Sequence, residues 1–225
     1  MSSIQYEIPN ISVDVVPIYL DVPNAKINVI LGRRQYEPYN NEFALPGVLL
    51  TPAERLNEAA ARALTRKAFI IHDDLSLLTD LGTFDNPDRD PRGATVSIAK
   101  VAVISHTFPP QNSNSVKVIP IDEASEASKH KLPFDHNNII RHAAELVSEK
   151  LLHSKDFTRA LLGESFTTSS IRGVFDQLAT IIPQSDIQVD FSNLGRVLKN
   201  SGWVRQTEDT YSTGRGRPSR RWTWV

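Results

Sequence analysis

The stretch that most constrains how this chain folds is residues 45–71, LPGVLLTPAERLNEAAARALTRKAFII. Pro46 and Gly47 open it and indicate a loop. Beyond them, apolar side chains recur at the spacing of one helix face: Leu56, Ala60, Leu64 and Ala68. These features alone predict an amphipathic helix that follows a loop, and an ordinary surface helix would also explain them.

The same stretch resembles the Nudix box, the signature motif of hydrolases that cleave pyrophosphates. That motif reads Gly, five residues, Glu, seven residues, and then Arg-Glu-aliphatic-any-Glu-Glu-any-Gly-aliphatic. The positions that agree with it are Glu54, Arg62, Leu64 and Ile70. The three other Glu positions hold Ala63, Arg66 and Lys67, and the two Gly positions hold Val48 and Phe69. The frame of the motif is kept, whereas most of its acidic residues are replaced.

The replaced residues bear directly on catalysis. Nudix hydrolysis requires Mg²⁺ or a similar hard cation, which oxygen ligands hold. Since positions three and four apart share a helix face, Ala63, Arg66 and Lys67 occupy the place of the carboxylate cluster. Two cations there would repel a metal ion and attract a phosphate. We therefore expect a binding domain without catalytic residues, metal site or cofactor; the alternative, an active Nudix hydrolase, would have to rely on Glu54.

Length and charge suggest two functional parts. The 225 residues suit one large or two modest domains, and the 40% hydrophobic content is enough for proper cores. Residues 154–225 carry 10 Lys and Arg against 7 Asp and Glu, whereas residues 1–153 carry 15 against 19. A mildly acidic first part and a basic second part place any contact with nucleic acid near the C-terminus.

Several absences narrow the class of protein. The chain has no cysteine, which excludes disulfides and thiolate metal sites. No apolar run approaches the roughly 20 residues that a membrane span needs. The first residues, MSSIQYEIPN, lack the basic flank and apolar segment of a signal peptide. We expect a cytoplasmic protein that does not associate with membranes.

The pattern over residues 1–153 predicts a domain of mixed α/β (α+β) type. Strands rich in β-branched residues are expected over 11–22 and 25–34, joined at Pro23-Asn24 as a hairpin. Further strands are expected over 75–84, 94–105 and 116–121, with polar loops at 35–42 and 122–131. A last helix is expected to follow Asp135, a candidate N-cap, and to continue to about His153.

Two basic segments of this first part are candidate ligand contacts. Gly32-Arg33-Arg34 ends a strand, and Arg33 is either a ligand contact or part of a solvated strand end. The loop Arg89-Asp90-Pro91-Arg92-Gly93 resembles that of Nudix proteins specific for ADP-ribose-like nucleotides, although a solvated turn would explain its polarity. Paired arginines suit diphosphate or ribose, because each guanidinium can donate two parallel hydrogen bonds. The ligand contacts that we expect are Arg33, Glu54, Arg62, Arg66, Arg89, Asp90 and Arg92.

Residues 154–225 show the pattern of helices followed by a hairpin. A threonine N-cap at Thr167-Thr168 would start a helix over 169–179, and Asp190 would cap a second helix over 191–200. Gly202 is suited to end that helix in left-handed geometry. Strands are expected over 203–211 and 220–225. The side chains expected to face the core from the second helix are Phe191, Leu194, Val197 and Leu198.

This order is typical of a winged helix-turn-helix, whose second helix enters the major groove while the wing contacts the backbone or minor groove. Arg215-Gly216-Arg217-Pro218 would form the wing tip, where arginines can lie along a narrow minor groove. A solubilising tip or a protein-binding arm is the alternative. The DNA contacts that we expect are Thr168, Ser192, Asn193, Arg196, Lys199, Arg215, Arg217 and Arg220.

Taken together, the box frame, RDPRG, LPFDH, the helix ending NSGWV, and GRGRPSRRW resemble the Nudix-related transcriptional regulators of NAD metabolism. The resemblance implies a Nudix-like effector domain (1–153) and a winged-helix DNA-binding domain (154–225). It also implies a homodimeric repressor that binds a palindromic double-stranded operator and senses a nucleotide such as ADP-ribose. A regulator of the same architecture that senses a sugar or sugar phosphate, as relatives controlling pentose use do, is the alternative.

Overall fold

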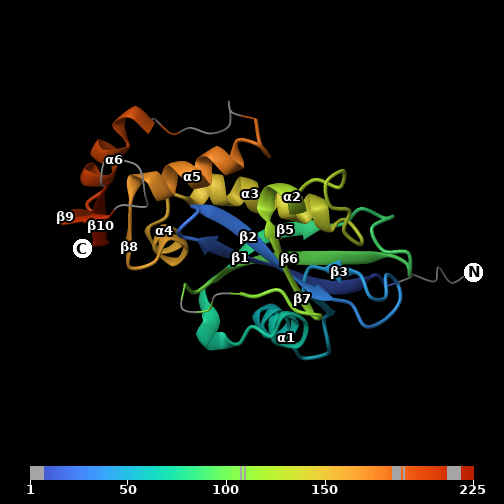
Figure 1. The fold of residues 1–225 in the computed structure, drawn as a ribbon. Coiled ribbons are helices and arrows are strands. Elements are labelled where there is room, and N and C mark those ends of the chain that lie inside the picture. Colours follow the sequence, from blue (N-terminus) through green and yellow to red (C-terminus); the bar gives the residue numbers. More distant parts are fainter. Residues whose placement is uncertain (1–7, 107, 109, 184–188, 190, 212–218) are drawn as a thin grey trace, which may run out of the picture.

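A mixed β-sheet forms the centre of the molecule (Figure 1). The computed structural model describes residues 8–106, 108, 110–183, 189, 191–211 and 219–225. Strands β1 (Asn10–Asp21) and β2 (Lys26–Arg33) pair antiparallel, which confirms the predicted hairpin. The main strand order is β3-β2-β1-β6-β5, with β4 paired to β1 and β7 to β2. The remaining strands of this sheet are β3 (Phe43–Ala44), β4 (Gly47–Leu49), β5 (Leu75–Phe84), β6 (Thr95–Ile104) and β7 (Val116–Pro120).

The two faces of the sheet are covered by different helices, because successive side chains of a strand point to opposite faces. On one face, Val13 and Val15 of β1 pack in a cluster with α1 (Leu56–Ala68). On the other, Val16 and Ile18 belong to a larger cluster that includes α3 (His136–Lys150). Figure 1 shows α1 on one side of the sheet and α2, α3 and α5 on the other.

Most predicted elements of the first part are confirmed, and one loop prediction was wrong. The segment 122–131 is not wholly loop, because a short helix, α2 (Ile121–Ala124), opens it. Asp135 does occupy the N-cap position of α3, but its side chain makes no capping bond. Its carboxylate accepts hydrogen bonds from Arg89 instead. The strand and helix pattern thus predicted the elements. It could not predict that Asp135 pairs with Arg89, because the two residues lie far apart in the sequence.

The second part has the expected helices and hairpin. Ser154 caps α4 (Lys155–Leu162), and Thr167 caps α5 (Thr168–Leu178) by accepting a hydrogen bond from the Ser170 amide. A 3-10 turn, η3 (Phe191–Asn193), leads into α6 (Leu194–Asn200). Gly202 has the predicted positive φ, +68°. The strands β8 (Ser165–Phe166), β9 (Val204–Tyr211) and β10 (Ser219–Trp224) form a second sheet in the order β8-β10-β9.

The inward face of α6 differs from the prediction at one position. Val197 is 44% exposed, whereas Leu194 and Leu198 are buried. The regular helix starts at Leu194, after the 3-10 turn, so its buried positions lie four residues apart and Val197 faces solvent. Asp190, Arg215 and Arg217, for which capping and DNA contacts were predicted, lie outside the described residues.

The two parts of the chain share one apolar core. The cluster around β1 and α3 continues through Phe157 of α4 and Phe175 of α5 to Trp222 of β10, which is 1% exposed. Helix α4 also contacts strands β1, β5 and β6 of the first sheet. In the described part of the chain, no helix is long and apolar enough to cross a membrane.

A buried glutamine joins α5 to the first sheet. The Gln177 side chain accepts a hydrogen bond from the Ile27 amide at 2.7 Å and donates one to the Ile27 carbonyl at 3.0 Å. It also donates to a carboxylate oxygen of Asp122 at 2.6 Å. One turn earlier, a Cβ added to Gly173 would lie 2.5 Å from the Cβ of Ala25, so the two backbones approach more closely than any larger residue allows. The Gln177 side-chain amide therefore bonds to the backbone of β2 and ties the second part of the chain to the first sheet.

We predict that Gln177→Ala lowers the free energy of unfolding by about 1–3 kcal/mol, because two buried backbone groups of Ile27 lose their partner. Urea titration followed by circular dichroism measures the loss. Gln206→Ala is the control, since Gln206 is exposed on β9, and a change within about 0.5 kcal/mol is expected there. Equal effects of the two substitutions would contradict the structural role assigned to Gln177.

Candidate ligand-binding and DNA-binding sites

A polar cavity of about 170 Å³ opens where β1, the end of α1 and several loops meet. Strand β1 contributes Ser12 and Asp14, and the loop between β5 and β6 contributes Arg89, Asp90 and Arg92. Side chains from the loop after β2, the end of α1, the segment before α3 and the first residue of α3 complete a wall that is mostly cationic and aromatic: Arg34, Tyr36, Glu37, Lys67, Phe134 and His136. The cavity thus adjoins the segment that resembles the Nudix box.

Asp14 is the buried carboxylate around which this wall is assembled. Its Oδ2 accepts hydrogen bonds from the hydroxyl groups of Ser97 at 2.6 Å and Ser12 at 3.3 Å, and from Arg89 at 3.2 Å. Gly47 faces the other oxygen, and an added Cβ there would lie 2.0 Å from Oδ1. Only glycine therefore fits beside Asp14, which fixes the path of the loop before β4.

Arg89 links Asp14 to the start of α3. Its guanidinium donates two hydrogen bonds to Asp135, at 2.8 and 3.1 Å, and its side chain is 3% exposed. Burial alone would lower the pKa of Arg89, but the bonds to Asp135 and Asp14 raise it above its usual value. These contacts make Arg89 a structural part of the cavity wall, a role that the sequence pattern did not distinguish from ligand contact.

Arg92 is the arginine of the same loop that remains accessible. Asp90 is buried and accepts three hydrogen bonds from Arg92, one from its amide at 3.0 Å and two from its guanidinium at 3.0 and 2.7 Å. The Arg92 side chain is nevertheless 47% exposed, and its Cζ lies 5.9 Å from the centre of the Phe134 ring. Asp90 therefore orients Arg92 at the mouth of the cavity.

Arg34 and Lys67 bring two more cations to the cavity. The Cζ of Arg34 lies 4.8 Å from the centre of the Phe134 ring, and its donors reach the carbonyls of Pro38 and Tyr36. Burial, and then the charge of Arg92, lowers the pKa of Arg34. Burial, and then the charges of Arg34 and Arg66, lowers the pKa of Lys67. The pKa of each group is thus lowered first by burial and second by neighbouring positive charge.

Glu54 and Arg62, the two charged residues that match the box, pair with each other and form a brace between the loop and α1. Arg62 donates to both oxygens of Glu54 at 2.7 Å and to the Leu49 carbonyl at 2.9 Å. The bond from Arg62 lowers the pKa of Glu54 to about 2. Ala63 is buried, whereas Arg66 is exposed and does not line the cavity. Among the described residues, no three His, Asp or Glu side chains are grouped so that they could hold a metal ion.

Of the seven predicted ligand contacts, three line this cavity and four do not. Arg89, Asp90 and Arg92 line it together, whereas Glu54 and Arg62 pair beside it. Arg33 points elsewhere, because its guanidinium donates to the carbonyls of Asn114 and Asn41 and covers the Phe43 ring. The prediction omitted cavity residues that come from separate segments: Asp14, Arg34, Lys67 and Phe134. Among these omitted residues, Lys67 could have been predicted from the sequence, because it replaces an acidic residue of the box.

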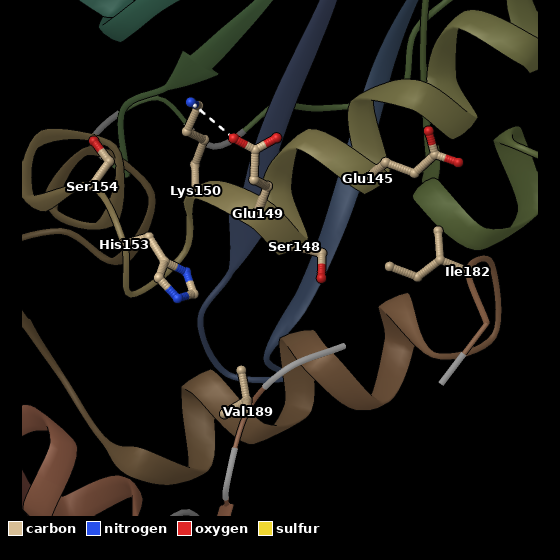
Figure 2. Close-up of a pocket in the computed structure, with 8 residues that line it drawn as sticks. All are labelled: Glu145, Ser148, Glu149, Lys150, His153, Ser154, Ile182 and Val189. Carbon is tan, nitrogen blue, oxygen red and sulfur yellow. Dashed lines mark hydrogen bonds and ion pairs between the residues drawn. The ribbon is translucent and has the colours of Figure 1, made fainter. Parts of the chain in front are cut away.

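A larger cavity of about 650 Å³ lies at the C-terminal end of α3 (Figure 2). It is lined by Glu145, Ser148 and Glu149 from α3, with Ile182 and Val189 opposite. Its one lysine, Lys150, donates to Glu149 at 3.2 Å. Carboxylates without free cations do not suit a phosphate, so we assign the effector to the smaller, cationic cavity.

The predicted DNA contacts that the structure describes lie on the winged-helix part. Ser192 and the side chains of Arg196 and Lys199 are exposed along η3 and α6, and Asn193 is half-buried. Thr168 is half-buried at the start of α5, and Arg220 is exposed on β10. Arg172 of α5 is also exposed and lies over the Phe191 ring at 5.5 Å. The prediction omitted Arg172, whose packing depends on the tertiary structure.

Two curated proteins are related to the chain in sequence, whereas no protein-family model matches it. An ADP-ribose pyrophosphatase of Methanocaldococcus jannaschii is 32% identical over 119 residues, which cover 50% of this chain and 63% of the enzyme. An ADPR responsive transcriptional repressor NtrR of Acinetobacter baylyi is 25% identical over 173 residues, which cover 76% of this chain and 67% of the repressor. The chain therefore spans about two thirds of the length of these relatives.

Solved structures share the fold over nearly the whole chain. Shewanella oneidensis NrtR complexed with a 27-mer DNA has a TM-score of 0.69 and 23% identity, covering 96% of this chain and 93% of that one. A MutT/nudix family protein of Enterococcus faecalis has a TM-score of 0.71 and 23% identity, covering 100% and 90%. These similarities confirm the predicted fold class, a Nudix-like domain with a mixed sheet followed by a winged helix.

His136 gives the site a measurable pH dependence. Its Nδ1 accepts a hydrogen bond from the Leu45 amide at 3.1 Å, and burial lowers its pKa to about 4. Between pH 6.5 and 4, His136 is therefore protonated in the unfolded chain and neutral in the folded protein. Stability should fall as the pH falls through this window, by at most about 1.4 kcal/mol per pH unit.

Chemical unfolding at several pH values tests this prediction. His136→Asn should flatten the slope between pH 6.5 and 4, because the titrating group is gone while an amide oxygen can still accept from Leu45. His72→Asn is the matched control, since the His72 side chain is 97% exposed. An unchanged slope in His136→Asn would show that another group causes the pH dependence.

Proposed function

We propose that this protein is a DNA-binding transcriptional regulator, acting as a repressor of NAD metabolism genes. In this proposal a nucleotide such as ADP-ribose binds the Nudix-like part (1–153) and controls how the winged-helix part (154–225) binds DNA. The observation that carries it is a cationic cavity beside a box without its acidic cluster, in one chain with a winged helix. The sequence similarity to an ADPR-responsive repressor supports the same reading.

The chemistry of the cavity supports a phosphate-bearing effector. Arg34, Lys67 and Arg92 converge on it, and arginine and lysine are the side chains that recognise phosphate in proteins. A neutral pentose would leave this positive charge unbalanced. The relative that cleaves ADP-ribose supports the same ligand class, although its catalytic activity is not part of the proposal.

We assign no hydrolase activity to the chain. Of the acidic positions in the box, one holds the buried Ala63, and Lys67 places an ammonium group in the cavity. The acidic residue that remains, Glu54, is paired with Arg62. Hydrolysis of a diphosphate by this fold requires carboxylates that hold a cation, so the altered positions favour binding without turnover.

The DNA-binding side of the proposal follows from the winged helix. Two-fold symmetric operators are read by symmetric dimers, because each half-site requires one recognition helix. We therefore propose a homodimer on a palindromic double-stranded operator, working in the cytoplasm. The effector would bind two arrangements of the dimer with different affinities, and only one of them would fit the operator. Each ligand would therefore change the affinity of the protein for the other.

The contact between the two parts gives this coupling a physical route. Gln177 and Gly173 hold α5 directly against Ile27 and Ala25, at the start of β2. The other end of β2 leads into Arg34 at the cavity. We propose that β2 moves as a rigid element when the effector binds, and so couples the cavity to the position of the DNA-binding part.

We predict that the chain binds ADP-ribose without consuming it. Calorimetric titration with ADP-ribose, NAD, arabinose and sugar phosphates should give the tightest binding for ADP-ribose. Product analysis with Mg²⁺ present should show turnover far below 1 per second, the lower end of ordinary enzyme rates. Turnover at such rates would establish a hydrolase, and preferential binding of arabinose would favour the sugar-sensing alternative.

We predict different effects of removing arginines from the helix and from the wing. Arg196→Ala should weaken binding to the correct site by about 1–3 kcal/mol and blur the sequence preference at the position that it contacts. Arg215→Ala and Arg217→Ala should weaken binding to all duplexes and reduce the salt dependence by about one charge each.

Gel shifts at several salt concentrations separate these effects. Lys129→Ala is the control, because Lys129 is exposed in the first part of the chain and pairs with Glu126. If both wing variants kept the affinity and salt slope of the unmodified protein, the wing would have no part in DNA binding.

A further inference from the structure

We propose that this protein binds the diphosphate of its effector without a divalent cation, using the charges of Lys67, Arg34 and Arg92 in place of a metal ion. The inference rests on the proposed function, since it concerns how the effector is held. It departs from the metal-assisted binding that the Nudix box implies. Three observations support it: the nearby carboxylates do not form a metal site, Arg34 and Lys67 have no carboxylate partner among the described residues, and the backbone fixes the end of α1 that carries Lys67.

The carboxylates near the cavity do not fit a metal ion. Both oxygens of Asp90 accept hydrogen bonds from Arg92, and Glu54 is held by Arg62 and Thr51. Oδ2 of Asp14 accepts from Ser97, Ser12 and Arg89, and its Oδ1 lies against Gly47. Glu37 is an exposed carboxylate at the rim, and one carboxylate does not form the oxygen cage that Mg²⁺ requires.

The cations, in contrast, have donors left for an anion. In the part of the chain that the structure describes, neither Arg34 nor Lys67 lies within 4.0 Å of a carboxylate. Arg34 donates to two carbonyls, and the Lys67 ammonium lies 5.8 Å from the centre of the Tyr36 ring. A bound diphosphate would supply the missing negative charge and relieve the repulsion between the two groups.

The backbone fixes the end of α1 that carries Lys67. A Cβ added to Gly32 would lie 2.1 Å from the Lys67 carbonyl oxygen, so β2 passes directly against the last turn of α1. This contact sets the end of α1 beside Arg34, which follows β2 in the chain. Phe134 lies beneath Arg34 and Arg92 and limits their freedom. The three cations therefore come from three segments that pack against one another around the cavity.

Binding of inorganic pyrophosphate and of ADP-ribose, each measured by calorimetry in EDTA and in Mg²⁺, tests the inference. We expect the unmodified protein to bind both ligands in EDTA, with affinities that Mg²⁺ changes less than threefold. Lys67→Gln should weaken both ligands about 10- to 100-fold, the loss of one charge-assisted hydrogen bond. Lys67→Glu should weaken them at least as much in EDTA and regain part of the affinity when Mg²⁺ is added.

Lys26→Glu is the matched control, because Lys26 is exposed at the opposite end of β2 and makes the same change of charge. Binding in Mg²⁺ but not in EDTA would overturn the inference, as would equal losses in Lys67→Glu and Lys26→Glu. Circular dichroism verifies that each variant is folded. Metal-free binding of pyrophosphate but not of ADP-ribose would support the cationic site and refute the proposed effector. Metal-dependent binding of ADP-ribose with an effect on DNA would leave the proposed function intact and refute this inference.

Discussion

The buried ion network of Asp14, Arg89 and Asp135 is the interaction on which the candidate site depends. It joins β1, the loop between β5 and β6, and the start of α3. Position 47 must be glycine, because a Cβ there would collide with Asp14. Removing one partner of such a network leaves an uncompensated buried charge, which commonly costs about 3–5 kcal/mol. The network thus holds the cavity wall next to Arg92 and Phe134 in place, with side chains that are at most 16% exposed.

The altered box illustrates how one frame can support two kinds of chemistry. The brace between Glu54 and Arg62 keeps the loop against the helix, and Phe69 adopts a positive φ of 58° where the motif has glycine. The backbone path therefore survives the loss of the acidic cluster. Exchanging a carboxylate position for Lys67 changes the sign of the charge at the cavity and so changes which ligands it favours.

Local patterns predicted the fold well, because apolar spacing, caps and turns are encoded in neighbouring residues. The hairpin, the box helix and the Thr167 cap are confirmed at nearly the expected bounds. The site was harder to predict from the sequence, because residues that pair in it lie far apart along the chain. Arg89 bonds to Asp135, 46 residues away, and Gln177 bonds to Ile27, 150 residues away. The composition of the RDPRG loop could not indicate which of its arginines is buried and which is accessible. Val197 was assigned to the core because the 3-10 turn before α6 left no signal in the apolar spacing.

The central claim is that effector and DNA bind different sites of one molecule and influence each other. The most direct test measures the affinity for a duplex selected from a random library, with and without saturating ADP-ribose, and the affinity for ADP-ribose with and without that duplex. The account predicts that ADP-ribose changes DNA affinity, and that DNA changes ADP-ribose affinity by the same factor, on the order of 5- to 150-fold. Both ligands binding with affinities that are independent of each other would contradict it.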